Sequence, residues 1–222
     1  MNLIGDHVDY VGLPVLPVAL SRRVSLLVRP RGDALVRVAS VTPDFGERAF
    51  ALEAEPPPWP DGDWGNYLKA AAADRVRAHA GLRGLDAVLT SEVPVAAGLS
   101  SSTALVVATA VAIEAVNGRK TPRLELAASL ARAERYVGTE GGGMDQAICL
   151  GARAGHAALI EFDPLRLDHV PIPSGWRFVV ADSLVRAEKS GAAREAYNDR
   201  ARSCRTALAR VRAALGPGQA PA

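Results

Sequence analysis

Residues 93–103, with the sequence VPVAAGLSSST, constrain this chain more than any other stretch. An apolar run ends there and a long helix rich in alanine and valine begins. Gly98 frees the backbone, and the hydroxyl residues that follow stand at the start of that helix. Because backbone N–H groups and the helix dipole are concentrated at a helix start, anions bind there. The pattern indicates a phosphate-binding loop, which we call the serine loop (residues 98–102).

Helix capping is the alternative explanation for these hydroxyls. Ser and Thr are favoured helix caps, and every helix start needs its first N–H groups satisfied. Three consecutive serines, at 100 to 102, exceed what one cap requires. The loop contains no Gly-Lys-Ser/Thr and is therefore no Walker A sequence, so a nucleotide site here belongs to a different architecture.

The composition describes an ordinary globular protein. The chain has 222 residues, of which 49% are hydrophobic and 23% charged, enough for one large or two small cores. A formal net charge of +2 gives no reason to expect nucleic acid or an anionic membrane as a partner. Aromatic residues amount to 5%, which leaves little for base stacking.

The cysteines and the N-terminal residues favour the cytoplasm. Cys149 and Cys204 stand far apart without metal-like spacing, which argues against a disulfide framework or a zinc site. Near the N-terminus, charged residues stand at the positions where a signal peptide would have a basic start and an apolar core. The apolar run 104–116 is too short to span a bilayer and contains Glu114. We therefore expect no targeting segment.

The periodicity of apolar residues predicts a mixed α/β (α+β) fold. Three strands forming an antiparallel meander are expected first, followed by a proline-rich loop at 56–60. Helices and strands then alternate, and a final amphipathic helix after Ser190 carries a basic face that we expect to be solvated. The predicted strands are 24–28, 34–38, 49–53, 87–90, 157–162 and 177–181, and the other predicted helices are 64–81, 102–117 and 122–137.

Residues 5–10, with the sequence GDHVDY, bring two carboxylates and an imidazole into one short segment, which we call the acidic loop. A simple turn is one explanation, because Asp commonly hydrogen bonds to nearby backbone in turns. Polyol recognition is the other. Carboxylates accept strong hydrogen bonds from hydroxyls, and a buried set of them rejects ligands that lack a matching OH.

Residues 138–146, with the sequence GTEGGGMDQ, form a second polar segment, the glycine loop. Three successive glycines suggest a backbone that something approaches closely, although a flexible loop is the alternative. Asp145 follows them and could orient a hydroxyl nucleophile and accept its proton, as an aspartate does in phosphoryl transfer. Glu134 could supply an oxygen ligand to Mg²⁺ beside a serine of the serine loop.

Together these segments are the complementary parts of a sugar kinase. Residues 2–10, 98–102 and 143–146, in this order, resemble the galactokinase branch of the GHMP kinases. The resemblance extends from Asn2 to about Ala209. Within that branch, residues 133–146, 160–165 and 181–185 look most like the N-acetylgalactosamine kinase type.

The resemblance implies a role for each motif residue. Sugar hydroxyls would bind to Asp6, His7 and Asp9, with Gly142 close to the sugar, and Asp145 would be the catalytic carboxylate toward the anomeric hydroxyl. The ATP phosphates would be wrapped by Gly98, Leu99, Ser100, Ser101 and Ser102. The resemblance also implies that Ser102 and Glu134 hold magnesium.

The resemblance further implies a fold and a reaction. Residues 1–215 would form the N-terminal domain of the GHMP kinase fold, which is like domain 2 of ribosomal protein S5, and residues 216–222 a disordered tail. The family's preceding arginine and its ferredoxin-like C-terminal domain would be missing. Asp6 stands where the family usually has Glu, and Val8 where it usually has Thr. We expect an ATP- and Mg²⁺-dependent kinase acting on galactose or a related sugar or, alternatively, a truncated non-catalytic sugar- or nucleotide-binding relic of one.

Overall fold

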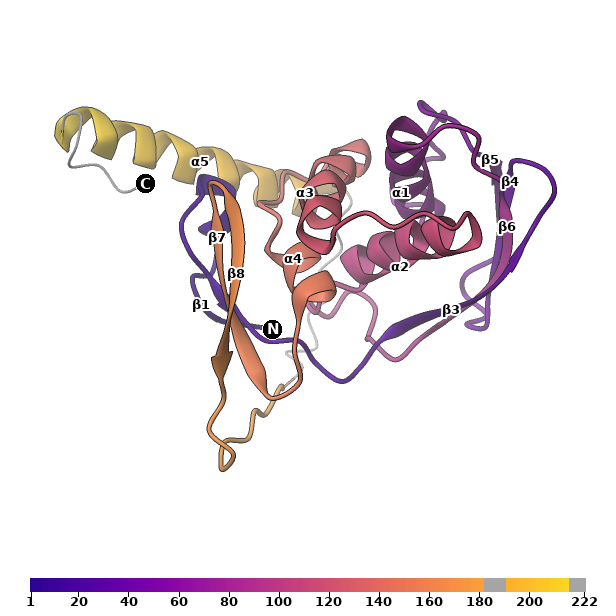
Figure 1. Cartoon of the computed structure of the whole chain (residues 1–222). Helices are drawn as coiled ribbons and strands as arrows, with labels where there is room; N and C mark the ends of the chain where they lie inside the picture. Colours follow the sequence, from indigo (N-terminus) through magenta and orange to yellow (C-terminus); the bar gives the residue numbers. More distant parts are fainter. Residues whose placement is uncertain (182–190, 216–222) are drawn as a thin grey trace.

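The computed structural model describes residues 1–181 and 191–215 as a mixed α/β structure, as the sequence predicts. A four-stranded sheet covered by two helices lies at one end, and two small two-stranded sheets lie at the other (Figure 1). Helices α3 and α4 lie between these parts. The predicted tail 216–222 and residues 182–185 of the family resemblance lie outside the described residues.

The large sheet consists of β3 (Val24–Pro30), β4 (Leu35–Ser40), β5 (Arg48–Ala51) and β6 (Leu85–Ser91), so four of the predicted strands are confirmed. Their order is β3-β6-β4-β5, with β6 antiparallel to β3 and parallel to β4. The predicted meander is therefore wrong: β6 inserts between β3 and β4. Gly84 permits this insertion, because a Cβ there would overlap the backbone of Leu35.

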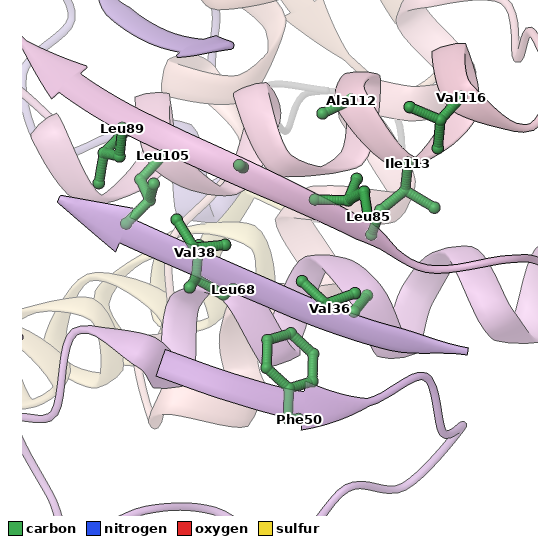
Figure 2. Packing of buried hydrophobic residues seen from close by; sticks show 12 residues of the cluster. Val36, Val38, Phe50, Leu68, Leu85, Leu89, Leu105, Ala112, Ile113 and Val116 are labelled. Atoms are coloured by element: carbon green, nitrogen blue, oxygen red, sulfur yellow. The ribbon is translucent and has the colours of Figure 1, made fainter. Parts of the chain in front are cut away.

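Helices α1 (Gly65–Ala78) and α2 (Ser101–Val116) cover one face of this sheet, close to their predicted positions. Figure 2 shows side chains from the strands and from both helices meeting in one core. Leu68 of α1 and Ile113 of α2 are completely buried between the layers. The apolar face of the sheet thus fixes where α2 begins, and with it the serine loop.

The helix predicted over 122–137 occurs as α3 (Arg123–Ala133), which continues into the 3-10 turn η2 (Glu134–Val137). Buried residues of α1, α2 and α3 form a second cluster that includes Ala71, Val106 and Leu130. The short helix α4 (Met144–Gly151) was not predicted, because the three glycines before it obscure the helical pattern.

The far end of the molecule combines the N-terminus with a hairpin. Strands β1 (Asn2–Ile4) and β2 (Leu16–Pro17) pair with each other, the 3-10 turn η1 (Asp9–Val11) lies between them, and β7 (His156–Phe162) pairs with β8 (Leu165–Pro171). Val15 bridges to Ile160, and both side chains are fully buried. Strand β7 was predicted, whereas β8 was not.

The strand predicted at 177–181 is wrong. Residues 176–181 have no assigned strand, and no strand in the described ranges pairs with them. The side chain of Val179 is 91% exposed. The apolar sequence is strand-like, but the pairing that a strand needs is not formed here.

The final helix, α5 (Gly191–Leu215), follows the predicted amphipathic pattern. It extends past the end of the β7–β8 hairpin (Figure 1). Among the helices in the described ranges, none has the length and apolar character required to cross a bilayer.

Candidate functional site

The serine loop and the glycine loop meet at Asp145. The hydroxyl of Ser100 donates a hydrogen bond to Oδ2 of Asp145 over 2.6 Å. Ser100 is the N-cap of α2 and has a left-handed backbone with φ 57°, while Asp145 lies in the first turn of α4. Two helix N-termini thus begin beside one carboxylate, which places the positive ends of both helix dipoles next to a negative group.

The glycine loop packs directly against the acidic loop. A Cβ at Gly142 would overlap the backbone of Asp9 and Tyr10. The close approach expected from the three glycines is therefore present, and it is made by the protein's own acidic loop. This contact brings two segments more than 130 residues apart in the sequence into one site.

Asp9 and Asp145 carry like charges close to each other. Burial raises the pKa of Asp9 above its ordinary value of 3.8, and the negative charge of Asp145 raises it further. Hydrogen bonds from the backbone N–H groups of Met144, Tyr10 and Gly142 oppose this rise. The two carboxylates and the glycine-loop backbone therefore form one polar centre.

An aromatic cluster forms one side of this centre. Nδ1 of His7 lies 3.0 Å from the hydroxyl of Tyr10, and the rings of both residues lie about 6 Å from the ring of Tyr197 on α5. Burial raises the pKa of Tyr10 to about 12. Asp6 is exposed at the edge of the acidic loop.

Tyr197 is a site residue that the sequence reasoning missed. Burial raises the pKa of its phenol, and the charges of Asp9, Asp145 and Glu134 raise it further. Its side chain therefore lies within range of all three carboxylates of the site. In the sequence, Tyr197 stands at helical spacing among apolar residues, and this pattern is typical of a core position. The pattern therefore gives no separate indication that Tyr197 belongs to a binding site.

Ser102 and Glu134 are brought together around Tyr67 of α1. Burial raises the pKa of Tyr67, the charge of Glu134 raises it further, and a hydrogen bond with the Ser102 side chain lowers it. Glu134 is 4% exposed. In the described ranges no group of three or more His, Cys, Asp or Glu side chains could hold a metal. One carboxylate with one hydroxyl suits Mg²⁺, which usually takes its remaining ligands from phosphates and water.

Ser100 and Asp145 line one end of a cleft of about 870 Å³, to which Leu99 and Cys149 also contribute. The cleft continues along α2 toward β3. Its volume lies within the range usual for small-molecule sites, about 300–1,000 Å³. Burial and the charge of Asp145 raise the pKa of Cys149 to about 12, so this thiol stays protonated and is a poor nucleophile.

The arginines of α5 do more than form the solvated basic face that the sequence predicts. Arg202 and Arg205 are exposed, as expected, and both also pair with Glu140 of the glycine loop, while Arg194 donates to Asp61 over 2.5 Å. These pairs dock the helix beside the site, so the basic residues serve more than solubility.

Two family models match the chain. Residues 1–30 match the galactokinase galactose-binding signature, and residues 66–153 match the GHMP kinases N terminal domain. The first range contains the acidic loop, and the second contains the serine loop, Glu134 and Asp145.

Whole-chain comparisons agree with these models. The chain is 39% identical to a galactokinase of Chloroflexus aggregans and 38% identical to one of Chloroflexus aurantiacus, in each case over 99% of this chain and 55% of the relative. Its structure matches that of Lactococcus lactis galactokinase complexed with galactose, with a TM-score of 0.79 and 27% identity, over 98% of this chain and 56% of that one. The chain thus spans about half the length of these relatives.

The fold and the arrangement of loops are those of the N-terminal part of a small-molecule kinase of this type. The chain belongs to the GHMP kinase family, in its galactokinase branch.

Proposed function

We propose that this chain forms the sugar- and ATP-binding part of an ATP-dependent sugar-1-kinase that phosphorylates the anomeric hydroxyl of galactose or a related sugar. The observation that carries the proposal is the position of Asp145. Its carboxylate is hydrogen bonded to Ser100 at the start of α2 and lies near Asp9 across the glycine loop. A candidate base, a candidate phosphate site and a candidate polyol site therefore share one centre.

The acidic loop is assigned to the sugar. Asp6, His7 and Asp9 would exchange hydrogen bonds with sugar hydroxyls, and Gly142 would lie close to the sugar. Tyr197 is assigned to the same pocket, because its ring lies 5.9 Å from the ring of His7 and 6.3 Å from the ring of Tyr10 in the acidic loop. A site built to hydrogen bond hydroxyls discriminates strongly against ligands that lack them.

Asp145 is assigned the role of catalytic carboxylate. Its Oδ2 accepts the Ser100 bond, so Oδ1 is the oxygen that we assign to the anomeric hydroxyl. There it would orient the nucleophile and accept its proton as the phosphoryl group is transferred. Positioning and charge stabilisation supply most of the catalysis in such reactions.

The serine loop is assigned to ATP. The backbone of Gly98, Leu99, Ser100 and Ser101 would face the phosphates at the N-terminus of α2. Ser102 and Glu134 would hold Mg²⁺, which neutralises charge on the phosphates when it is bound. We also propose a cytoplasmic location, with both cysteines as free thiols as in the structure.

The test is ADP release by the full-length protein with galactose, N-acetylgalactosamine, arabinose and glucose. Galactose is the first candidate, because the similar Lactococcus lactis galactokinase was solved with galactose. We expect Asp145→Asn to lower kcat by about 10²–10⁴-fold, the usual contribution of a general base. Unchanged turnover in Asp145→Asn would contradict the mechanism. Sugar binding without ADP release at any Mg²⁺ concentration would favour the non-catalytic binding alternative.

A further inference from the structure

One face of α5 touches both sugar-site loops. Arg194, Tyr197, Asn198, Ala201 and Arg205 recur at helical spacing on this face, and Ala201 is completely buried. Of the residues on this face, some contact the acidic loop and others contact the glycine loop. The helix therefore bridges two loops that are far apart in the sequence.

Asn198 fixes the beginning of the glycine loop with both ends of its amide. Its Oδ1 accepts a hydrogen bond from the backbone N–H of Glu140 over 3.2 Å, and its Nδ2 donates to the carbonyl of Gly138 over 2.9 Å. Because one planar group satisfies both bonds, it sets the position and the orientation of residues 138–140 together.

Neighbouring contacts support the same three residues. Arg194 donates to the carbonyl of Val137 over 3.4 Å, and its side chain packs against Gly138. The carboxylate of Glu140 pairs with Arg205 and, at 3.9 Å, with Arg202. These ion pairs are at least one-third exposed and weakly directional, so the Asn198 amide, with its two directional bonds to backbone, is the more specific constraint.

The other contacts of α5 reach the acidic loop. The ring of Tyr197 packs near the rings of His7 and Tyr10, and the hydroxyl of Tyr10 donates to the sulfur of Cys204 over 3.8 Å. Beyond residue 140 the glycine loop continues to Gly142, which presses on the acidic loop, and to Asp145. Displacing residues 138–140 would therefore displace both of these groups.

We infer that Asn198 is a positioning residue, which holds the glycine loop in register with the acidic loop so that Gly142 and Asp145 face the sugar. Asn198 is assigned no contact with the sugar or with ATP, and it acts through residues 138–140. The inference rests on the proposed function for its link to sugar, and on the structure alone for its link to the loop.

Asn117 provides a matched control. It brackets the backbone of Arg83 in the same way, accepting from its N–H over 2.9 Å and donating to its carbonyl over 3.0 Å. It follows the C-terminus of α2, whereas the serine loop precedes the N-terminus of that helix. Asn117→Ala therefore removes a similar pair of hydrogen bonds, together with the one that Nδ2 donates to the carbonyl of Ile113 over 2.8 Å, at a place distant from Asp145.

The experiment compares wild type, Asn198→Ala, Asn198→Asp and Asn117→Ala by hydrogen exchange of residues 138–145 and by calorimetric titration with galactose. For Asn198→Ala we expect exchange at 138–145 to become about tenfold faster and the galactose Kd to rise about tenfold, the effect of losing one to two net hydrogen bonds. Asn198→Asp keeps only the acceptor and should fall between wild type and Asn198→Ala. Asn117→Ala should match wild type in both measurements.

The inference would be overturned if residues 138–145 exchanged hydrogen as slowly in Asn198→Ala as in wild type. It would also be overturned if Asn117→Ala accelerated exchange at these residues as much as Asn198→Ala does. If Asn198→Ala fails to fold, the exchange of Asn198→Asp decides in the same way. Absence of galactose binding by the wild type would count against the proposed function, and the exchange measurement would still decide whether Asn198 positions the loop.

Discussion

Individual carboxylates define this site. Asp9 and Asp145 come from loops that are far apart in the sequence, and burial together with the negative charge of Asp145 raises the pKa of Asp9. Two like charges held close together oppose folding, but the same arrangement suits a ligand that brings several hydroxyl donors. The proximity of the two carboxylates therefore lowers the free energy of unfolding.

The titration of Asp9 gives a pH prediction. Its folded pKa lies above 3.8, because burial and the charge of Asp145 both disfavour the ionised form. As pH rises from 3.8 through the folded pKa, the unfolded carboxyl ionises first, so the folded state loses stability relative to the unfolded state. We expect the free energy of unfolding of the wild type, relative to Asp9→Asn, to fall across this window and then to level off. Urea unfolding of wild type and Asp9→Asn at a series of pH values measures this difference in the free energy of unfolding. A difference that rises with pH would contradict a raised pKa for Asp9.

The residues predicted from the sequence are those carried by short contiguous motifs. Asp145 follows the three glycines that identify its segment, and Glu134 lies four residues before the glycine loop; the structure brings Asp145 to Ser100 and Glu134 near Ser102. Tyr67 and Tyr197 could not be found in this way. Each lies on a helix where an aromatic residue is equally expected for packing, and only the folded structure brings its phenol close enough for the carboxylates to raise its pKa.

At the scale of elements, long strongly periodic segments were predictable and pairing was not. Helices α1, α2, α3 and α5 follow from the spacing of their apolar residues. The order of the large sheet does not, because the turn after β3 suggests a hairpin while burial places β6 in the middle. The prediction of a strand at 177–181 fails for the same reason, because the apolar pattern does not reveal whether a strand will find a partner.

A buried ionic cluster joins the three helices behind the site. The guanidinium of Arg75 on α1 is 1% exposed and donates to Glu114 of α2 over 2.6 Å and to Ser129 of α3 over 2.9 Å. It also pairs with Asp74. Arg75 thereby ties together the helices that carry Tyr67, Ser102 and, just after α3, Glu134.

Removing this arginine should be costly. Arg75→Met leaves Glu114 buried with an uncompensated charge, so we expect a loss of about 3–5 kcal/mol in the free energy of unfolding. The double variant Arg75→Met/Glu114→Gln should recover part of that loss, because the buried charge is also removed. Urea unfolding of both variants tests this, and a loss below about 1 kcal/mol in Arg75→Met, as for an exposed pair, would show that the cluster is not effectively buried.

For the whole molecule, the central feature is the convergence of three loops that begin at residues 5, 98 and 138. The sheet core fixes the serine loop, the hairpin core fixes the acidic loop, and α3, α4 and α5 fix the glycine loop between them. The sequence could predict these loops separately and, through the family resemblance, their shared site. Their contact depends on packing between distant segments, above all at Gly142.

Calorimetric titration of this chain with galactose, comparing wild type, Gly142→Ala and Gly32→Ala, tests most directly whether the acidic and glycine loops form one sugar site. Gly142→Ala places a methyl group on the backbone of Asp9 and Tyr10, whereas a Cβ at Gly32 meets nothing within 4 Å. We predict galactose binding by the wild type and by Gly32→Ala, and its loss in Gly142→Ala. Absence of binding by the wild type, or wild-type affinity in Gly142→Ala, would contradict the claim that the acidic and glycine loops form one sugar site.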